Sequence, residues 1–237
     1  MSDSQDRQVN RERMWQYFFQ DDPYAGFDPT PFPDDVQGWG SDDPIFERLI
    51  DYLRPKIIVE VGTWKGRSAI QMAQICRARG LPTNILCIDT WLGTIESYTW
   101  RERDPEIHTS LKFRHGWPHL YYQFLANVVR RGFQDMITPL PQTSEIGARL
   151  LAHLQIVPDL VYIDASHDYS DVVKDLVSYF NILQPGGVLF GDDYVHWESV
   201  TRAVQDFANH ARHPFWGRPG KYAIMKGGDV RSIPNLT

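Results

Sequence analysis

Short apolar runs alternate along the chain with longer segments whose apolar residues recur at helical spacing. Runs this short and this apolar are typical of strands that are buried on both faces of a parallel sheet. Strands that alternate with helices pair in parallel through right-handed crossovers, so the pattern predicts one α/β domain with a doubly wound, mostly parallel sheet. The predicted strands are 57–61, 85–88, 136–140, 160–163, 188–190 and 222–225, and the predicted helices are 44–53, 68–79, 117–131, 147–154, 171–183 and 198–211.

Two stretches depart from this pattern. Residues 1–43 are rich in proline, aspartate, glycine and aromatic residues, which favours turns but leaves many rings to pack. We expect an N-terminal arm or lid there, followed by a single domain over residues 44–237. Residues 90–117 show no clear period, and we expect them to form an insertion on the substrate side of that domain.

Composition and charge narrow the class of protein. The formal net charge is -6, and residues 1–53 hold twelve Asp/Glu against four Lys/Arg, which argues against nucleic-acid binding at that end. No apolar run approaches the ~20 residues that cross a bilayer, and the first residues contain no apolar targeting segment. We therefore expect a cytoplasmic protein without membrane contact, in which Cys76 and Cys87 are reduced core thiols.

A glycine-rich turn follows the first predicted strand. Gly62 and Gly66 allow the backbone to bend tightly and to approach a ligand. The turn lacks the G-x-G-x-x-G spacing of dinucleotide sites, and Glu60 on the strand would repel a phosphate, so the pattern favours a ligand with a cationic end. Asp89 ends the next strand, where an acid can accept hydrogen bonds from a ribose diol. The alternative interpretation is a tight strand-to-helix connection and nothing more.

Three aspartates end neighbouring predicted strands. Asp164, Asp192 and Asp193 each follow a short apolar run, and the carboxyl ends of parallel strands open onto a common crevice. Carboxylates gathered there would be costly unless they are solvated, paired or bound to a cation, so the cluster indicates a hard metal ion or a cationic ligand. The alternative interpretation is that one acid caps a turn and the others are solvated loop residues.

Residues 57–225 resemble the class I S-adenosylmethionine-dependent methyltransferases. The resemblance lies in the 60–66 turn, the strand end at 87–91, the strand at 159–164 and the turn at 185–187. It implies a Rossmann-like sheet with an antiparallel last strand, and S-adenosylmethionine as cofactor. The cofactor-binding residues that it implies are Glu60, Gly62, Thr63, Gly66 and Ser68 near the methionine part, Asp89 and Thr90 at the ribose, Gln142, Thr143 and Ser144 near the adenine, and Asp164.

The acids look like those of the metal-dependent small-molecule O-methyltransferases, which include catechol, caffeoyl-coenzyme A, macrolide-sugar and cephalosporin-hydroxylase-like branches. Asp164, Asp192 and Asp193 match the metal ligands of that group position by position, which implies Mg²⁺, or Mn²⁺ or Ca²⁺. His167 stands where the catechol branch has a lysine base. With an unperturbed pKa near 6.5, it is the predicted catalytic base, although a lone histidine is more often structural. The resemblance implies a small-molecule hydroxyl acceptor, such as a sugar or a natural product, and self-association into a homo-oligomer.

Two other functions are kept as alternatives. A catalytically inactive S-adenosylmethionine-binding scaffold would keep the same fold, and the intact set of acids argues against it. A nicotinamide-dependent oxidoreductase could use a similar sheet, but the glycine turn lacks its spacing and Glu60 would face the phosphates.

Overall fold

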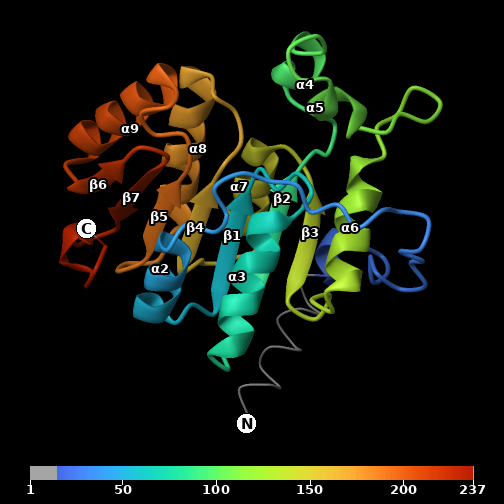
Figure 1. The fold of residues 1–237 in the computed structure, drawn as a ribbon. Coiled ribbons are helices and arrows are strands. Elements are labelled where there is room, and N and C mark those ends of the chain that lie inside the picture. The colour runs from blue at the N-terminus through green and yellow to red at the C-terminus, as the bar shows by residue number, and fades with distance from the viewer. Residues whose placement is uncertain (1–14, 237) are drawn as a thin grey trace.

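The computed structural model describes residues 15–236, which form a seven-stranded sheet between two layers of helices (Figure 1). The strand order is β3-β2-β1-β4-β5-β7-β6. The strands from β3 to β5 are parallel, whereas β7 is antiparallel to both β5 and β6. This confirms the predicted doubly wound sheet with an antiparallel end. The strands are β1 Ile57–Val61, β2 Asn84–Asp89, β3 Ile137–Pro141, β4 Leu160–Ile163, β5 Val188–Gly191, β6 Phe215–Arg218 and β7 Lys221–Met225.

Each face of the sheet is covered by three long helices, and each interface has its own hydrophobic core. On one face, Phe46 and Phe124 from the helices pack with Tyr162 and Phe190 from the strands. On the other face, helix residues such as Leu176 pack against the opposite side chains of the same strands. The first layer contains α2 Ile45–Leu53, α3 Arg67–Ala78 and α6 Leu120–Arg130, and the second contains α7 Ser144–His153, α8 Tyr169–Ile182 and α9 Glu198–Ala211.

The crossovers place a crevice at the carboxyl ends of the central strands. From β1 the chain crosses to β2 and β3 on one side, while β4 and β5 continue the sheet on the other side. The loops that follow β1 and β4 therefore diverge, which leaves space above the point where the strand order reverses. The glycine turn follows β1, and the predicted acids follow β4 and β5.

The structure contains regular elements that the apolar pattern did not predict. In the expected insertion, two short helices, α4 Ile95–Thr99 and α5 Pro105–Thr109, stand above the sheet (Figure 1). A helix of five residues is too short to show a clear apolar period. Strand β6 was also missed because it is an edge strand whose residues are half-buried or exposed, and a short 3₁₀ turn, Val230–Ser232, follows β7.

The described part of the arm runs along the carboxyl edge of the sheet and is tied to it by polar contacts (Figure 1). The Asp35 carboxylate lies 2.8 Å from the ammonium of Lys65, which is only 1% exposed. The indole N–H of Trp64 donates to Gln37 at 2.9 Å, and the Asn127 amide donates to the carbonyl of Asp35 at 2.7 Å. These contacts hold residues 35–37 over the glycine turn.

The cysteines and the helix lengths bear on two simpler expectations. Cys76 and Cys87 are both buried and free, as predicted for reduced core thiols. Within residues 15–236, no helix combines the length and the apolar character that crossing a bilayer would require.

Candidate active site

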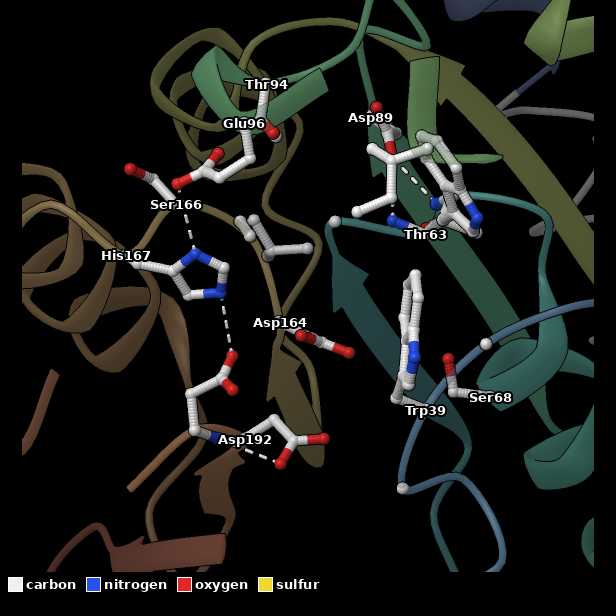
Figure 2. A pocket seen from close by; sticks show the side chains of 18 of the residues that line it. Trp39, Thr63, Ser68, Asp89, Thr94, Glu96, Asp164, Ser166, His167 and Asp192 are labelled. Carbon is white, nitrogen blue, oxygen red and sulfur yellow. Dashed lines mark hydrogen bonds and ion pairs between the residues drawn. The ribbon is translucent and has the colours of Figure 1, made fainter. Parts of the chain in front are cut away.

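A large cavity lies at the carboxyl edge of the sheet, with a volume of about 1060 Å³. It is lined by parts of the arm, of the expected insertion and of the loops that follow the strands. In Figure 2, Trp39 and Ser68 stand on one side of it, and Asp164, His167 and Asp192 stand on the other. The lining residues come from segments 37–43, 61–68, 88–97, 100–107, 142–144, 164–167, 192–197 and 219–221, and from Leu120.

Two positions of the turn require glycine, because the backbone there has a positive φ and passes close to other atoms. Gly62 has a φ of +80°, and a Cβ at this position would lie 2.0 Å from the carbonyl oxygen of Asp164. Its N–H donates to the carbonyl of Ile88 at 2.9 Å. Gly66 has a φ of +87°, and a Cβ there would lie 2.9 Å from the ring of Phe124. The turn therefore passes so close to β4 that backbone atoms form this wall of the cavity.

Asp89 orders the glycine turn from the end of β2. One carboxylate oxygen accepts hydrogen bonds from the N–H groups of Thr63 and Trp64, both at 2.8 Å, and the other accepts from the N–H of Trp91 at 2.7 Å. Burial raises the pKa of Asp89, although these backbone donors oppose the shift. Both Asp89 and Thr90 line the cavity. Asp89, the acid predicted to bind a ribose, therefore also links the glycine turn to the segment that follows β2.

Glu60 lies beneath the cavity and is not one of its lining residues. Its side chain is fully buried, and it accepts a hydrogen bond from the hydroxyl of Ser68, with Thr63 at 3.4 Å and Cys87 at 3.5 Å. Burial raises the pKa of Glu60 to about 8, and the charge of Asp164 adds to the shift. The carboxyl is therefore mainly neutral at pH 7, and its contacts support the turn from below.

The segment predicted to contact the adenine is divided in the structure. Gln142 and Ser144 line the cavity, whereas Thr143 is not a lining residue. Thr143 is the N-cap of α7, and its hydroxyl accepts a hydrogen bond from the N–H of Ile146 at 3.3 Å. The hydroxyl of Ser144 donates to Asp175, and burial raises the pKa of that carboxyl to about 6.

The acids after β4 and β5 also line the cavity, with Asp164 next to the glycine turn. The hydroxyl of Tyr162 lies 3.1 Å from Asp164 and 3.1 Å from Asp192, so it joins the two carboxyl groups. Burial, together with the negative charges of Asp192 and Asp193, raises the pKa of Asp164 to about 7. Asp192 forms an ion pair with the ammonium of Lys221, whose side chain is 2% exposed.

His167 lies between two carboxylates (Figure 2). Its Nε2 is 2.9 Å from Asp193, and its Nδ1 is 3.4 Å from Glu96. Burial lowers the pKa of His167, but the two carboxylates outweigh this effect, so the pKa is raised above its usual range. Both nitrogens donate when the ring is charged. Each ring nitrogen of the predicted base therefore faces a carboxylate, and neither is without a partner.

A stack of four side chains forms the upper wall beside His167. We call it the acceptor-side stack, and it consists of Arg103, Trp100, Trp197 and His167. The rings of His167 and Trp197 are nearly parallel, with centroids 4.2 Å apart, and those of Trp197 and Trp100 are nearly parallel at 5.9 Å. The guanidinium of Arg103 covers Trp100 at 4.3 Å. The stack joins the expected insertion to the loops after β4 and β5.

As they are arranged, the three acids do not form a site that fits a divalent ion. Asp192 is paired with Lys221, and Asp193 is paired with His167. Across residues 15–236, no three side chains of His, Cys, Asp or Glu are grouped so that they could hold a metal ion. The sequence predicted that the acids share one edge of the sheet, which they do, but it did not predict the cations that balance them.

Sequence reasoning missed several residues of this site, above all Lys221, Tyr162, Glu96 and Trp197. Tyr162 lies within an otherwise apolar strand, and Glu96 lies in a segment whose apolar residues have no regular spacing, so the sequence pattern marked neither of them. Lys221 immediately precedes the predicted last strand, and a single cation at the start of a buried strand was the available signal.

Two curated relatives match much of the chain. A protein of Sinorhizobium fredii (strain NBRC 101917 / NGR234), named uncharacterized protein y4gI, is 26% identical over 162 residues, which are 68% of this chain and 16% of that protein. The chain therefore spans only a small part of this relative. A protein of Acanthamoeba polyphaga mimivirus, named uncharacterized protein R132, is 24% identical over 187 residues, which are 76% of this chain and 68% of that protein.

Solved structures share the fold at low sequence identity. Cofactor-bound Rv0187 from MTB has a TM-score of 0.59 at 15% identity, with 92% of this chain and 96% of that chain covered. The O-methyltransferase from Bacillus cereus in complex with SAH has a TM-score of 0.53 at 17% identity, covering 86% and 87%. The O-methyltransferase TomG from Streptomyces achromogenes, in complex with SAM, has a TM-score of 0.53 at 12% identity, covering 96% and 100%.

The model of one protein family matches residues 59–194, from the glycine turn to the acids after β5. That family is Methyltransf_24, described as a methyltransferase domain. The match covers more than half of the chain and includes both sides of the cavity. The chain therefore belongs to this methyltransferase family.

Proposed function

We propose that this protein transfers a methyl group from S-adenosylmethionine to a hydroxyl oxygen of a small molecule. The observation that carries the proposal is that one continuous cavity of about 1060 Å³ contains both the glycine turn and the acids after β4 and β5. A methyl donor bound along the turn and an acceptor bound at the acids would share this one space.

The charge of the cavity suits a cationic cofactor. Its lining residues include seven Asp/Glu and three Lys/Arg. S-adenosylmethionine carries a sulfonium and an ammonium group, whereas a nicotinamide dinucleotide carries phosphates that these acids would repel. Membership of a methyltransferase family points the same way and removes the case for an oxidoreductase. TomG and the Bacillus cereus enzyme, which share the fold, were solved with SAM and SAH respectively.

The acceptor side suits a polar small molecule. The acceptor-side stack offers ring edges, while Asp164, Ser166 and His196 offer hydrogen-bonding groups along the same wall. Rings combined with polar groups are typical of sites that bind sugars and hydroxylated natural products. The cofactor, when bound, supplies a methyl group activated by the positive charge on sulfur. The protein then has to orient the hydroxyl in line with that group and remove its proton.

Two side chains are candidates for receiving the proton. His167 is the one predicted from the sequence, but it must first release Asp193 or Glu96. Asp164 lines the cavity, and its Oδ1 has no hydrogen-bond partner in the described part of the chain. We therefore propose Asp164 as the proton acceptor and His167 as the alternative. With Asp164→Asn, transfer should be abolished, whereas His167→Gln should reduce it; the reverse order would favour His167.

The resemblance also implies that a divalent metal ion assists the transfer, and we retain this as the alternative mechanism. An ion held by Asp164, Asp192 and Asp193 would have to displace Lys221 and His167 from two of these acids. Its signature would be loss of methyl transfer in the presence of EDTA and recovery with Mg²⁺ or Mn²⁺.

The proposed function is tested by separating cofactor binding from turnover. Calorimetry should show that SAH binds and that NAD does not, and radiolabelled S-adenosylmethionine should methylate members of a panel of hydroxylated sugars and phenols. Asp89→Asn should weaken SAH binding, whereas Asp21→Asn, on the exposed arm, should not. Binding without transfer to any hydroxyl would favour the inactive scaffold, and NAD binding alone would overturn the proposal.

A further inference from the structure

The ammonium group of Lys221 lies against Asp192, one of the three acids predicted to bind a metal ion. Lys221 is the first residue of β7, which pairs with β5, and the Gly191–Tyr222 pair brings Lys221 beside Asp192. Its Nζ forms an ion pair with Oδ2 of Asp192. Lys221 also lines the cavity, although only 1% of its surface is exposed to solvent. A cation of the chain itself therefore pairs with an acid that the resemblance assigns to a metal ion.

The surroundings of this ammonium fit an organic cation better than a divalent metal. Its Nζ lies 5.8 Å from the ring centroid of Phe46 and 5.6 Å from that of Tyr162. Aromatic faces attract an ammonium through their quadrupole, but they offer no lone pair for a metal. Mg²⁺ requires oxygen ligands in a near-octahedral set. The hydroxyl of Tyr162, which could be one of them, already joins Asp164 and Asp192.

The arm lies against one side of the ion pair. Gly40 has a φ of +58°, and a Cβ at that position would lie 2.9 Å from Oδ2 of Asp192 and 2.9 Å from Nζ of Lys221. The backbone of the arm therefore lies directly against the pair. Mg²⁺ in proteins usually keeps several water molecules, and this side of Asp192 has no room for them.

Displacing Lys221 would also carry an energetic penalty. A buried ammonium without its carboxylate is strongly destabilising, because its desolvation is no longer offset. A metal ion bound to Asp192 would leave Lys221 in that state, and His167 would lose Asp193 as well. A metal ion bound by both Asp192 and Asp193 would therefore have to break two ion pairs.

We propose that Lys221 replaces the divalent cation in this protein, so that the acidic cluster positions the acceptor without a metal. Lys221 is a positioning residue: it fixes Asp192 and, through Tyr162, the carboxyl of Asp164. The inference rests on the proposed function only where methyl transfer is measured, and its metal-binding part can be tested without turnover.

The first measurement is Mn²⁺ binding to the full chain in the presence of SAH, by electron paramagnetic resonance. The wild-type protein should show no saturable site at millimolar Mn²⁺. Lys221→Met removes the charge and keeps much of the apolar stem, so it should create a site that binds Mn²⁺ about tenfold or more tightly than any wild-type binding. Adding Asp192→Asn to this variant should remove the new site. A purely structural lysine would not produce this gain.

The controls separate charge from folding. Lys221→Arg keeps a cation and should bind no Mn²⁺, and Lys174→Met changes an exposed lysine, 64% accessible, and should behave as the wild type. Thermal melting of each variant checks that it is folded. If Lys221→Met does not fold, Lys221→Gln takes its place, and the wild-type measurement still decides.

Saturable Mn²⁺ binding to the wild type that Asp192→Asn abolishes would overturn the inference, as would the absence of any gain in the folded Lys221→Met or Lys221→Gln variant. Methyl transfer by the wild type should be unchanged in EDTA, whereas transfer by Lys221→Met should be lower and respond to Mn²⁺. If the binding results are as expected but no variant transfers a methyl group, the proposed function fails and the inference about Lys221 stands.

Discussion

The two sides of the cavity are built in different ways. The side proposed to bind the cofactor is made of backbone, with glycines that pass close to β4 and with N–H groups bound by Asp89. The side proposed to bind the acceptor is made of charged side chains from distant segments: His167 contacts Glu96, 71 positions away in the sequence, and Lys221 contacts Asp192, 29 positions away. Steric exclusion therefore fixes the first side and charge balance fixes the second, so substitutions on the two sides should fail in different ways.

The largest effect is expected from Gly62→Ala. Its new Cβ would lie 2.0 Å from the carbonyl oxygen of Asp164, so either β1 or β4 must move. We expect the free energy of unfolding to fall by more than about 4 kcal/mol and SAH binding to be lost, as measured by urea unfolding and calorimetry. Gly80→Ala is the matched control, because its φ is +63° but no atom lies within 4 Å of the added Cβ. It should cost only about 1 kcal/mol; equal losses would mean that backbone conformation, and not the close approach, is decisive.

Asp192→Asn tests the charge balance on the acceptor side. It leaves the buried Lys221 ammonium without its carboxylate, which should lower the free energy of unfolding by about 3 kcal/mol. The exposed pair of Asp171 with Lys174 is the control, and Asp171→Asn should cost less than about 1 kcal/mol. Combining Asp192→Asn with Lys221→Met should recover much of the stability. A double variant as unstable as Asp192→Asn would show that the cost does not come from an unpaired ammonium.

This contrast also explains how far the sequence could predict the molecule. Strands β1 and β4 were predicted with their observed bounds, because buried parallel strands are continuous apolar runs. The need for glycine at position 62 was likewise visible, since it arises where a strand turns into a helix. The pair of Lys221 with Asp192 was not, because it depends on the register of β7 against β5. Acids that share a sheet edge could be predicted, whereas their partners required the tertiary structure.

Glu60→Gln tests whether the support beneath the glycine turn is neutral. The pKa of Glu60 is raised to about 8 from 4.5, so its contribution to stability is full below pH 4.5 and is lost as the pH rises through 8. Glutamine does not titrate, so the stability of Glu60→Gln relative to the wild type should rise over this interval, by up to about 1.4 kcal/mol per pH unit. Urea unfolding at several pH values measures this slope. Glu145→Gln, at an exposed side chain, should show no such slope, and a flat difference for Glu60→Gln would mean that Glu60 is ionised in the folded protein.

The smallest effect is expected from Trp100→Leu, which removes one ring from the acceptor-side stack. The ring centroids of Trp100 and Trp197 are 5.9 Å apart, and the rings are nearly parallel. Such a pair contributes about 1 kcal/mol of stability beyond that of its buried area. Because the stack joins the 90–117 segment to the loop that carries His167, the variant should raise the KM for the acceptor several-fold and leave the affinity for SAH unchanged. Trp117→Leu, in the same segment but 63% exposed, is the control and should alter neither value. If Trp100→Leu weakens SAH binding as much as it raises the KM, the cavity does not divide into two independently built sides, and the acceptor wall must also shape the cofactor site.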